Sequence, residues 1–160
     1  MTSTSTPKAT ALKKSDFNTF ITVQTRWADN DIYGHVNNAT YYNYFDTAVN
    51  SWLIDQGLLS LHSQDIAEPI GLVVSNQCQF LASIYFPQTL SIGLRVEHLG
   101  NSAVRYGLAV FTPNDITPND NVCAALAQFT HVYVNRVTRQ PMALSEHWRK
   151  CLRTILMNNS

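Results

Sequence analysis

The stretch ATYYNYFDTAVNSWLIDQG, residues 39–57, has the spacing of a long helix. Its apolar side chains recur every three or four positions, at Tyr41, Tyr44, Phe45, Ala48, Trp52 and Leu53. Asn37 or Asn38 can cap such a helix and Gly57 can end it, so the pattern predicts a helix over residues 39–56. Because the segment carries few charges and has bulky groups on more than one side, we expect the rest of the domain to cover it.

Strand patterns flank this helix on both sides. Residues 17–27, FNTFITVQTRW, are β-branched and aromatic and predict a first strand. After a polar link, four more strands are predicted, at residues 71–86, 89–100, 102–111 and 122–137. The turn Gly100-Asn101 joins two of them into a hairpin, which favours an antiparallel sheet. Residues 145–156, SEHWRKCLRTIL, predict a short amphipathic helix with Ser145 as its cap.

This order of elements predicts an α+β fold, with an antiparallel sheet of about five strands wrapped around the long helix. A single chain of this size cannot cover both faces of the sheet. The last strand, residues 122–137, has apolar residues on both sides, so we expect partner subunits to pair through it. We expect one domain over residues 17–156, preceded by a flexible leader over residues 1–16 that is rich in Ser and Thr.

Composition narrows the class of protein. The chain has 160 residues, of which 45% are hydrophobic, and its 11 Lys and Arg balance 11 Asp and Glu. We therefore expect no nucleic-acid partner, and the chain has no apolar run of about 20 residues for crossing a bilayer. Its cysteines, Cys78, Cys123 and Cys151, are widely spaced without a C-x-x-C pair. This usage indicates neither a disulfide framework nor a zinc site, and it favours the cytoplasm.

The zero net charge hides a segregation along the chain. Residues 1–14 carry three Lys and no acid, residues 15–80 carry seven acids against one Arg, and residues 81–160 carry seven basic residues against four acids. This pattern directs attention to acid chemistry in the first half and to anion binding in the second.

The loop before the helix, DNDIYGHVNN at residues 29–38, gathers two carboxylates, an imidazole and amides. Unpaired N–H groups at a helix start can hold the oxyanion that forms when a carbonyl is attacked. A nearby carboxylate can then act as nucleophile or as general base for water, which suffices for acyl-transfer hydrolysis. Two other interpretations stay open. The loop is also typical of a capped turn, and Asp29, Asp31 and His35 could bind a metal, although no second His or paired Glu follows on the helix.

Residues 26–41, RWADNDIYGHVNNATY, resemble the signature of the hotdog-fold acyl-CoA thioesterases of the 4-hydroxybenzoyl-CoA thioesterase type, D-x-D-x-x-G-H-V-N-N-x-x-Y. A looser similarity in the order of elements extends over residues 19–150. The resemblance implies a hotdog fold and a homodimer or homotetramer. It also implies hydrolysis of an acyl-CoA to the free acid and CoA, with no cofactor besides the CoA of the substrate and no bound metal.

The resemblance also implies roles for individual residues. Asp31 takes the place of the family's catalytic carboxylate, either as nucleophile or as general base. Gly34 would permit close approach of the backbone, and the backbone amide of Asn38 would be an oxyanion donor. His35 would hydrogen-bond within the loop or orient the substrate, whereas Asp29 would order the loop or cap a backbone N–H.

Substrate binding involves a second set of predicted residues. Asn37 is a helix cap or a substrate contact, and Tyr41 is a core residue that could also line the acyl pocket. Arg95, Arg105 and Arg136 are candidates, as a group, for the phosphates of CoA. Strand arginines that merely face solvent are the competing interpretation for each of them.

Two alternative functions remain at this stage. An acyl-carrier-protein thioesterase would need a contiguous basic patch near the pocket mouth, because the carrier is acidic. A hotdog protein that binds an acyl ligand without cleaving it is the other alternative, and the presence of Asp31 argues against it.

Overall fold

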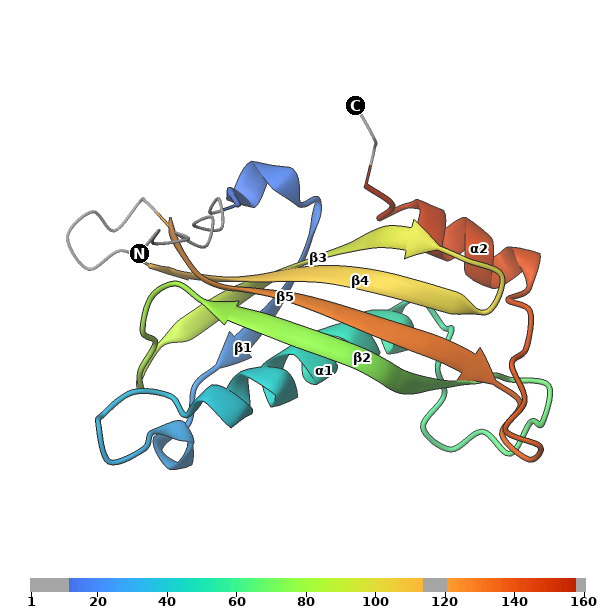
Figure 1. Cartoon of the computed structure of the whole chain (residues 1–160), viewed down its shortest axis with the longest axis horizontal. Coiled ribbons are helices and arrows are strands. Elements are labelled where there is room, and N and C mark those ends of the chain that lie inside the picture. Colours follow the sequence, from blue (N-terminus) through green and yellow to red (C-terminus); the bar gives the residue numbers. More distant parts are fainter. Residues whose placement is uncertain (1–11, 114–120, 158–160) are drawn as a thin grey trace, which may run out of the picture.

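The computed structural model describes residues 12–113 and 121–157, which form one five-stranded sheet and two α-helices (Figure 1). The strands are β1 (Thr19–Gln24), β2 (Ile70–Phe80), β3 (Thr89–Leu99), β4 (Ala103–Pro113) and β5 (Asn121–Val134). The helices are α1 (Asn38–Asp55) and α2 (Glu146–Arg153), and two short 3-10 helices are η1 (Lys14–Asp16) and η2 (Trp27–Asp29). The strand order is β1-β3-β4-β5-β2, and every neighbouring pair is antiparallel.

The long helix is the one that the sequence predicts, to within a residue at each end. The Asn37 side chain caps α1 by accepting a hydrogen bond from the Ala39 N–H at 2.9 Å. Gly57 follows the helix at a φ of +69°, a conformation that glycine adopts without strain. All six apolar residues of the predicted helical face are buried.

The concave face of the sheet packs on α1 and forms the main core. Leu90, Ile92, Leu94 and Val96 of β3 and Val104, Tyr106, Leu108 and Val110 of β4 are at most 1% exposed. Burying one such aliphatic side chain is worth about 1.5–3 kcal/mol, so this face supplies much of the stability that holds the helix in place. The predicted hairpin is present, with the Gly100 N–H donating to the Ala103 carbonyl at 2.8 Å. A long helix wrapped by an antiparallel sheet is the hotdog fold, as predicted.

The pairing of subunits through the last strand stays a prediction, and β5 has no free edge for it. β5 is an interior strand, hydrogen-bonded to β4 on one edge and to β2 on the other. Its apolar residues on both faces have another cause, because Cys123 and Leu126 pack with Phe17 and Phe111 on the face opposite α1. The edge strands of the described sheet are β1 and β2.

Of the predicted leader, residues 1–11 lie outside the described residues. Lys14–Asp16 form η1, and Phe17 then lies on the outer face of β3, directly over Gly93. A Cβ at Gly93 would approach the Phe17 ring to 2.6 Å, so the sheet needs glycine there for the ring to pack. In the described residues, no helix is both long and apolar enough to span a membrane.

Candidate active site

The loop between η2 and α1 is closed by hydrogen bonds within its own backbone. The Asn37 N–H donates to the Asp29 carbonyl at 2.9 Å, and the Asp31 N–H donates to the His35 carbonyl at 2.9 Å. A turn at the tip follows, in which the Gly34 N–H donates to the Asp31 carbonyl at 3.1 Å and Gly34 has a φ of +79°. The loop is therefore a defined structure that holds Asp31 beside the start of α1.

Asp29 lies at the base of this loop and is 3% exposed. Its carboxylate accepts hydrogen bonds from the Tyr44 hydroxyl at 2.5 Å, the Arg26 N–H at 2.8 Å and the Arg26 Nε at 3.0 Å. Burial alone would raise the pKa of Asp29, but the hydrogen bonds from Tyr44 and Arg26 outweigh it and lower the pKa. Of the two roles expected for Asp29, the structure confirms the cap on a backbone N–H, that of Arg26.

Asp31 is half-buried and has a different environment. Its Oδ1 accepts a hydrogen bond from the Tyr33 N–H at 2.8 Å, which fixes the direction of the side chain. Among the residues that the structure describes, none donates a hydrogen bond to its Oδ2. This oxygen belongs to a residue that lines a cavity of about 470 Å³.

Three segments form the walls of this cavity. The loop and the first turns of α1 contribute Asp31, Tyr33, His35, Val36, Asn37, Asn38 and Tyr41, and the end of β2 with the residues after it contributes Phe80, Leu81, Ala82 and Ser83. The loop and the start of α1 therefore supply most of the polar lining, and the residues at the end of β2 are mostly apolar.

The start of α1 also presents hydrogen-bond donors to this cavity. The side-chain oxygen of Asn37 caps the helix, as one of the two expected roles requires. A contact with the substrate, the other expected role, would have to use a different atom of Asn37. Within the described structure, the backbone N–H groups of His35 and Asn38 have no acceptor, and both residues line the cavity. Unpaired N–H groups at a helix start are suited to stabilising an oxyanion.

Tyr41 belongs to the apolar side of the cavity. It is buried, and its ring meets the Phe80 ring edge-to-face at 5.0 Å. Burial raises the pKa of Tyr41 to about 12, although a hydrogen bond with the Ile84 backbone opposes the rise. The phenol is therefore neutral near pH 7, and Tyr41 serves at once as a core residue and as part of the cavity wall.

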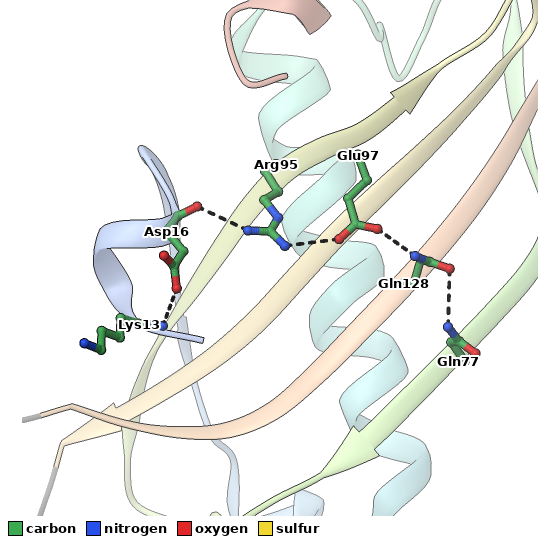
Figure 2. A network of polar contacts seen from close by, with 6 residues as sticks. All are labelled: Lys13, Asp16, Gln77, Arg95, Glu97 and Gln128. Carbon is green, nitrogen blue, oxygen red and sulfur yellow. Dashed lines mark hydrogen bonds and ion pairs between the residues drawn. The ribbon is translucent and has the colours of Figure 1, made fainter. Parts of the chain in front are cut away.

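The three predicted arginines do not line this cavity. Arg95 points to the outer face of the sheet, where it pairs with Glu97 at 3.3 Å and lies over the Phe17 ring. Figure 2 shows the chain of polar contacts that continues across the strands, from Glu97 to Gln128 at 2.6 Å and on to Gln77. The charge of Arg95 is thus used within the fold.

The other two arginines lie on β4 and just beyond β5. Arg136 donates to the Ser63 carbonyl at 2.8 Å and is 3.8 Å from the carboxylate of Glu68, so it holds the link between α1 and β2. Arg105 is exposed on β4. Arg105 lies two residues from Gly107, the partner of Arg95 in the β3–β4 pairing, so these two arginines share the outer face of the sheet, whereas Arg136 lies beyond the end of β5.

The sequence interpretation missed two parts of this site. Tyr44 follows helical spacing, which marked it as core and gave no sign that its hydroxyl reaches Asp29. The wall at residues 80–83 comes from a distant part of the chain, and only the folded arrangement brings it to the loop. As for metal sites, no group of three or more His, Cys, Asp or Glu in residues 12–113 and 121–157 is arranged to hold an ion.

With this geometry established, the chain can be placed among known proteins. It matches the family model of the thioesterase-like superfamily over residues 25–152, and it belongs to this family. The match spans the loop, all the residues that line the cavity and strands β2 to β5, and it begins directly after β1. The resemblance of the loop signature to thioesterases is thereby confirmed at the level of the family.

Individual solved structures share the fold. The PA5185 protein of Pseudomonas aeruginosa has a crystal structure that is 42% identical and covers 91% of this chain and 96% of its own, with a TM-score of 0.81. SAV2348 of Staphylococcus aureus, solved in complex with CoA, is 16% identical with a TM-score of 0.74 and covers 85% of this chain and 82% of its own. At that identity the likeness shows the fold alone.

Two further relatives complete the comparison. DHNA-CoA thioesterase from Staphylococcus aureus is 16% identical, covers 85% of this chain and 89% of its own, and has a TM-score of 0.72. The uncharacterized protein YsmA of Bacillus subtilis is 28% identical over 91 residues, which are 57% of this chain. The chain spans 59% of the length of that curated relative.

Proposed function

We propose that this protein is an acyl-CoA thioesterase in which Asp31 is the catalytic carboxylate. The observation that carries the proposal is the meeting of two complementary groups in one cavity. Asp31 has a carboxylate oxygen without a hydrogen-bond donor among the described residues, and the N–H of Asn38, equally without an acceptor there, lies at the start of α1. A nucleophile or base beside oxyanion donors is the minimum that thioester hydrolysis requires.

The chemistry can follow either of two routes. As a general base, Asp31 removes a proton from water while the water oxygen bonds to the thioester carbon, and the C–S bond breaks to release the CoA thiolate. As a nucleophile, a carboxylate oxygen of Asp31 itself bonds to that carbon, the C–S bond breaks to release the CoA thiolate, and water then hydrolyses the resulting anhydride to the free acid and the Asp31 carboxylate. In both routes the N–H groups of Asn38 and His35 stabilise the negative charge on the carbonyl oxygen.

The cavity walls support an acyl thioester as the substrate class. Tyr41, Phe80 and Leu81 provide an apolar part of the cavity lining, and it suits the acyl group. CoA is favoured over an acyl carrier protein because an acidic carrier needs a contiguous basic patch. Arg95 and Arg136 are each engaged in ion pairs, and none of Arg95, Arg105 and Arg136 lines the cavity, so the predicted group forms no basic patch at its mouth. The CoA complex of SAV2348 lends further support.

A homodimer or homotetramer belongs to the same proposal. The edge strand β2 leaves Leu72, Val73 and Val74 exposed at 38%, 45% and 59%, and its end forms one wall of the cavity. A second copy that covers this strand would bury these side chains close to the site. Sedimentation of the purified protein measures the assembly directly.

The test of the proposed function is a panel of aliphatic and aromatic acyl-CoAs of varied chain length, assayed for thiol release. Wild type, Asp31→Asn and Asp55→Asn are run together, since Asp55 is an exposed aspartate at the far end of α1. We expect turnover by wild type and Asp55→Asn and a loss of about 100-fold or more in Asp31→Asn, the typical contribution of a general base. Undiminished turnover in folded Asp31→Asn would contradict the assignment.

The same panel separates the alternatives. Cleavage of acyl carrier protein thioesters with no cleavage of any acyl-CoA would favour the carrier-protein enzyme. An acyl-CoA that binds wild type and is recovered intact after long incubation would favour a binding protein.

A further inference from the structure

We propose that Tyr44 is a positioning residue for the reaction, which holds the catalytic loop to α1 through Asp29 and so sets the place of Asp31. The inference rests on the proposed function, because it needs a reaction at Asp31 to act upon. Tyr44 itself does not line the cavity, so its effect must pass through the loop.

The contact between helix and loop is short and buried. Tyr44 lies in the second turn of α1 and is 4% exposed, and its hydroxyl donates to Asp29 Oδ2 at 2.5 Å. The same oxygen accepts the Arg26 N–H, so one carboxylate oxygen joins the segment before the loop to the helix after it. Hydrogen bonds to an ionised carboxylate are stronger than neutral ones and have tighter geometry.

Asp29 passes this constraint to the rest of the loop through its backbone. Its carbonyl accepts the Asn37 N–H at 2.9 Å, and Asn37 is the cap of α1. Asp31 then follows two residues later, held by the His35 carbonyl and by the bond between its own Oδ1 and the Tyr33 N–H. Both ends of the loop are therefore tied to α1, one through the Tyr44 hydroxyl and the other through the helix cap.

The oxyanion donor and the carboxylate need a fixed separation for catalysis. The Asn38 N–H belongs to α1, whereas Asp31 belongs to the loop, and Tyr44 is the side chain that ties the base of the loop to the helix. A displacement of about 1 Å in a reacting group can lower a rate by about 100-fold. Loss of the Tyr44 hydroxyl should therefore slow the chemical step rather than weaken substrate binding.

The protonation of the pair suits this role. Burial and the adjacent Asp29 carboxylate together raise the pKa of Tyr44, while the pKa of Asp29 is lowered. The phenol therefore keeps its proton and the carboxylate stays ionised across the neutral range, so the contact persists at every pH at which the enzyme would work.

The test compares two tyrosine-to-phenylalanine variants. Tyr44→Phe keeps the ring and removes the hydroxyl that reaches Asp29. Tyr106→Phe is the matched control, because it removes another buried hydroxyl, which hydrogen-bonds Tyr133 at 2.7 Å in the core. Each is assayed for kcat and KM with an acyl-CoA that wild type hydrolyses, and each is melted to confirm folding.

We expect kcat of Tyr44→Phe to fall at least 10-fold with KM changed less than 3-fold, and kcat of Tyr106→Phe to stay within 2-fold of wild type. The 10-fold limit for kcat is one tenth of the about 100-fold loss that a full 1 Å displacement can cause. Equal kcat values for the two variants, when both are folded, would overturn the proposal.

A double variant tests the route through Asp29. If Tyr44 acts by way of Asp29, adding Tyr44→Phe to Asp29→Ala should lower kcat no further, because Asp29→Ala already removes the acceptor of the Tyr44 hydroxyl. Independent, multiplicative losses would overturn that route. Failure of the proposed function has a different signature, since wild type would then hydrolyse no acyl-CoA or Asp31→Asn would retain full activity.

Discussion

Two carboxylates stand two residues apart in the same loop, and their environments are opposite. Asp29 is buried, and both of its oxygens accept hydrogen bonds from Tyr44 and Arg26. Asp31 is half-buried beside the cavity, and one of its oxygens has no donor among the described residues. A carboxylate whose lone pairs are all engaged contributes stability, whereas one with a free oxygen beside a cavity is available to react.

This contrast supports the roles that we propose for the two aspartates. Both residues are aspartates in the signature, and composition does not distinguish them. The difference comes from the helix, because Tyr44 reaches back to Asp29 and leaves Asp31 to the cavity. Changing Asp29 should therefore lower both stability and activity, whereas changing Asp31 should lower activity alone.

The largest expected effect on stability is that of Asp29→Asn. It replaces a charged acceptor of several buried hydrogen bonds, and we expect unfolding free energy to fall by about 2 kcal/mol, the size of a hydrogen bond to a charged group. Urea unfolding measures the change, with Asp55→Asn as the exposed control. A variant as stable as wild type would show that Asp29 does not hold the loop.

A matched pair of glycine substitutions tests whether the shape of the loop matters for activity. Gly34 and Gly57 both have positive φ, at +79° and +69°, and neither has an atom within 4 Å of an added Cβ. Gly34→Ala and Gly57→Ala should each cost about 1 kcal/mol of stability through backbone strain. Only Gly34→Ala should also lower kcat, because Gly34 forms the turn after Asp31. Equal kcat values for the two variants would show that the shape of the loop does not affect catalysis.

The smallest expected effect is a pH dependence of stability that originates at Asp29. The folded-state pKa of Asp29 lies below its ordinary value of 3.8, so the folded state binds fewer protons there than the unfolded chain does. Its contribution is therefore complete above pH 3.8 and is lost as the pH falls through the lowered folded-state value. The stability difference between wild type and Asp29→Asn should shrink over that range in urea titrations. A difference that is constant from neutral to acidic pH would contradict the assignment of the shift.

Much of the fold could be predicted because its patterns are local. Helical spacing from Tyr41 to Leu53, with a cap at Asn37 and a stop at Gly57, placed α1 within one residue. Alternation and the Gly100 turn gave the hairpin of β3 and β4. These signals depend on residues a few positions apart, so they can be recognised in the sequence alone.

The order of the strands could not be predicted in the same way. Apolar residues on both faces of β5 report that both faces are covered, and they do not report which strands lie beside it. The polar run Ser75–Gln79 in β2 was the available sign of an edge strand. The apolar part of the cavity lining could not be predicted either, because it depends on contacts between distant segments. The pairing of β2 with β5 brings residues 80–83 to the loop.

The same distinction between local and distant residues applies to the candidate site. The loop and the start of α1 are contiguous in sequence, and the structure brings Asp31, His35, Asn37, Asn38 and Tyr41 to one cavity. The arginines were chosen by charge alone, and Arg95 and Arg136 are engaged in ion pairs elsewhere. Charge predicts what a side chain can bind, but its partners in the fold decide whether it is free to do so.

The central claim is that Asp31 does the chemistry while Asp29 holds the loop. Its most direct test is the rate of thiol release by Asp31→Asn at saturating acyl-CoA, measured beside its urea unfolding midpoint. The account predicts a rate at least about 100-fold below wild type with an unchanged midpoint. A folded Asp31→Asn variant that releases thiol at the wild-type rate would contradict it.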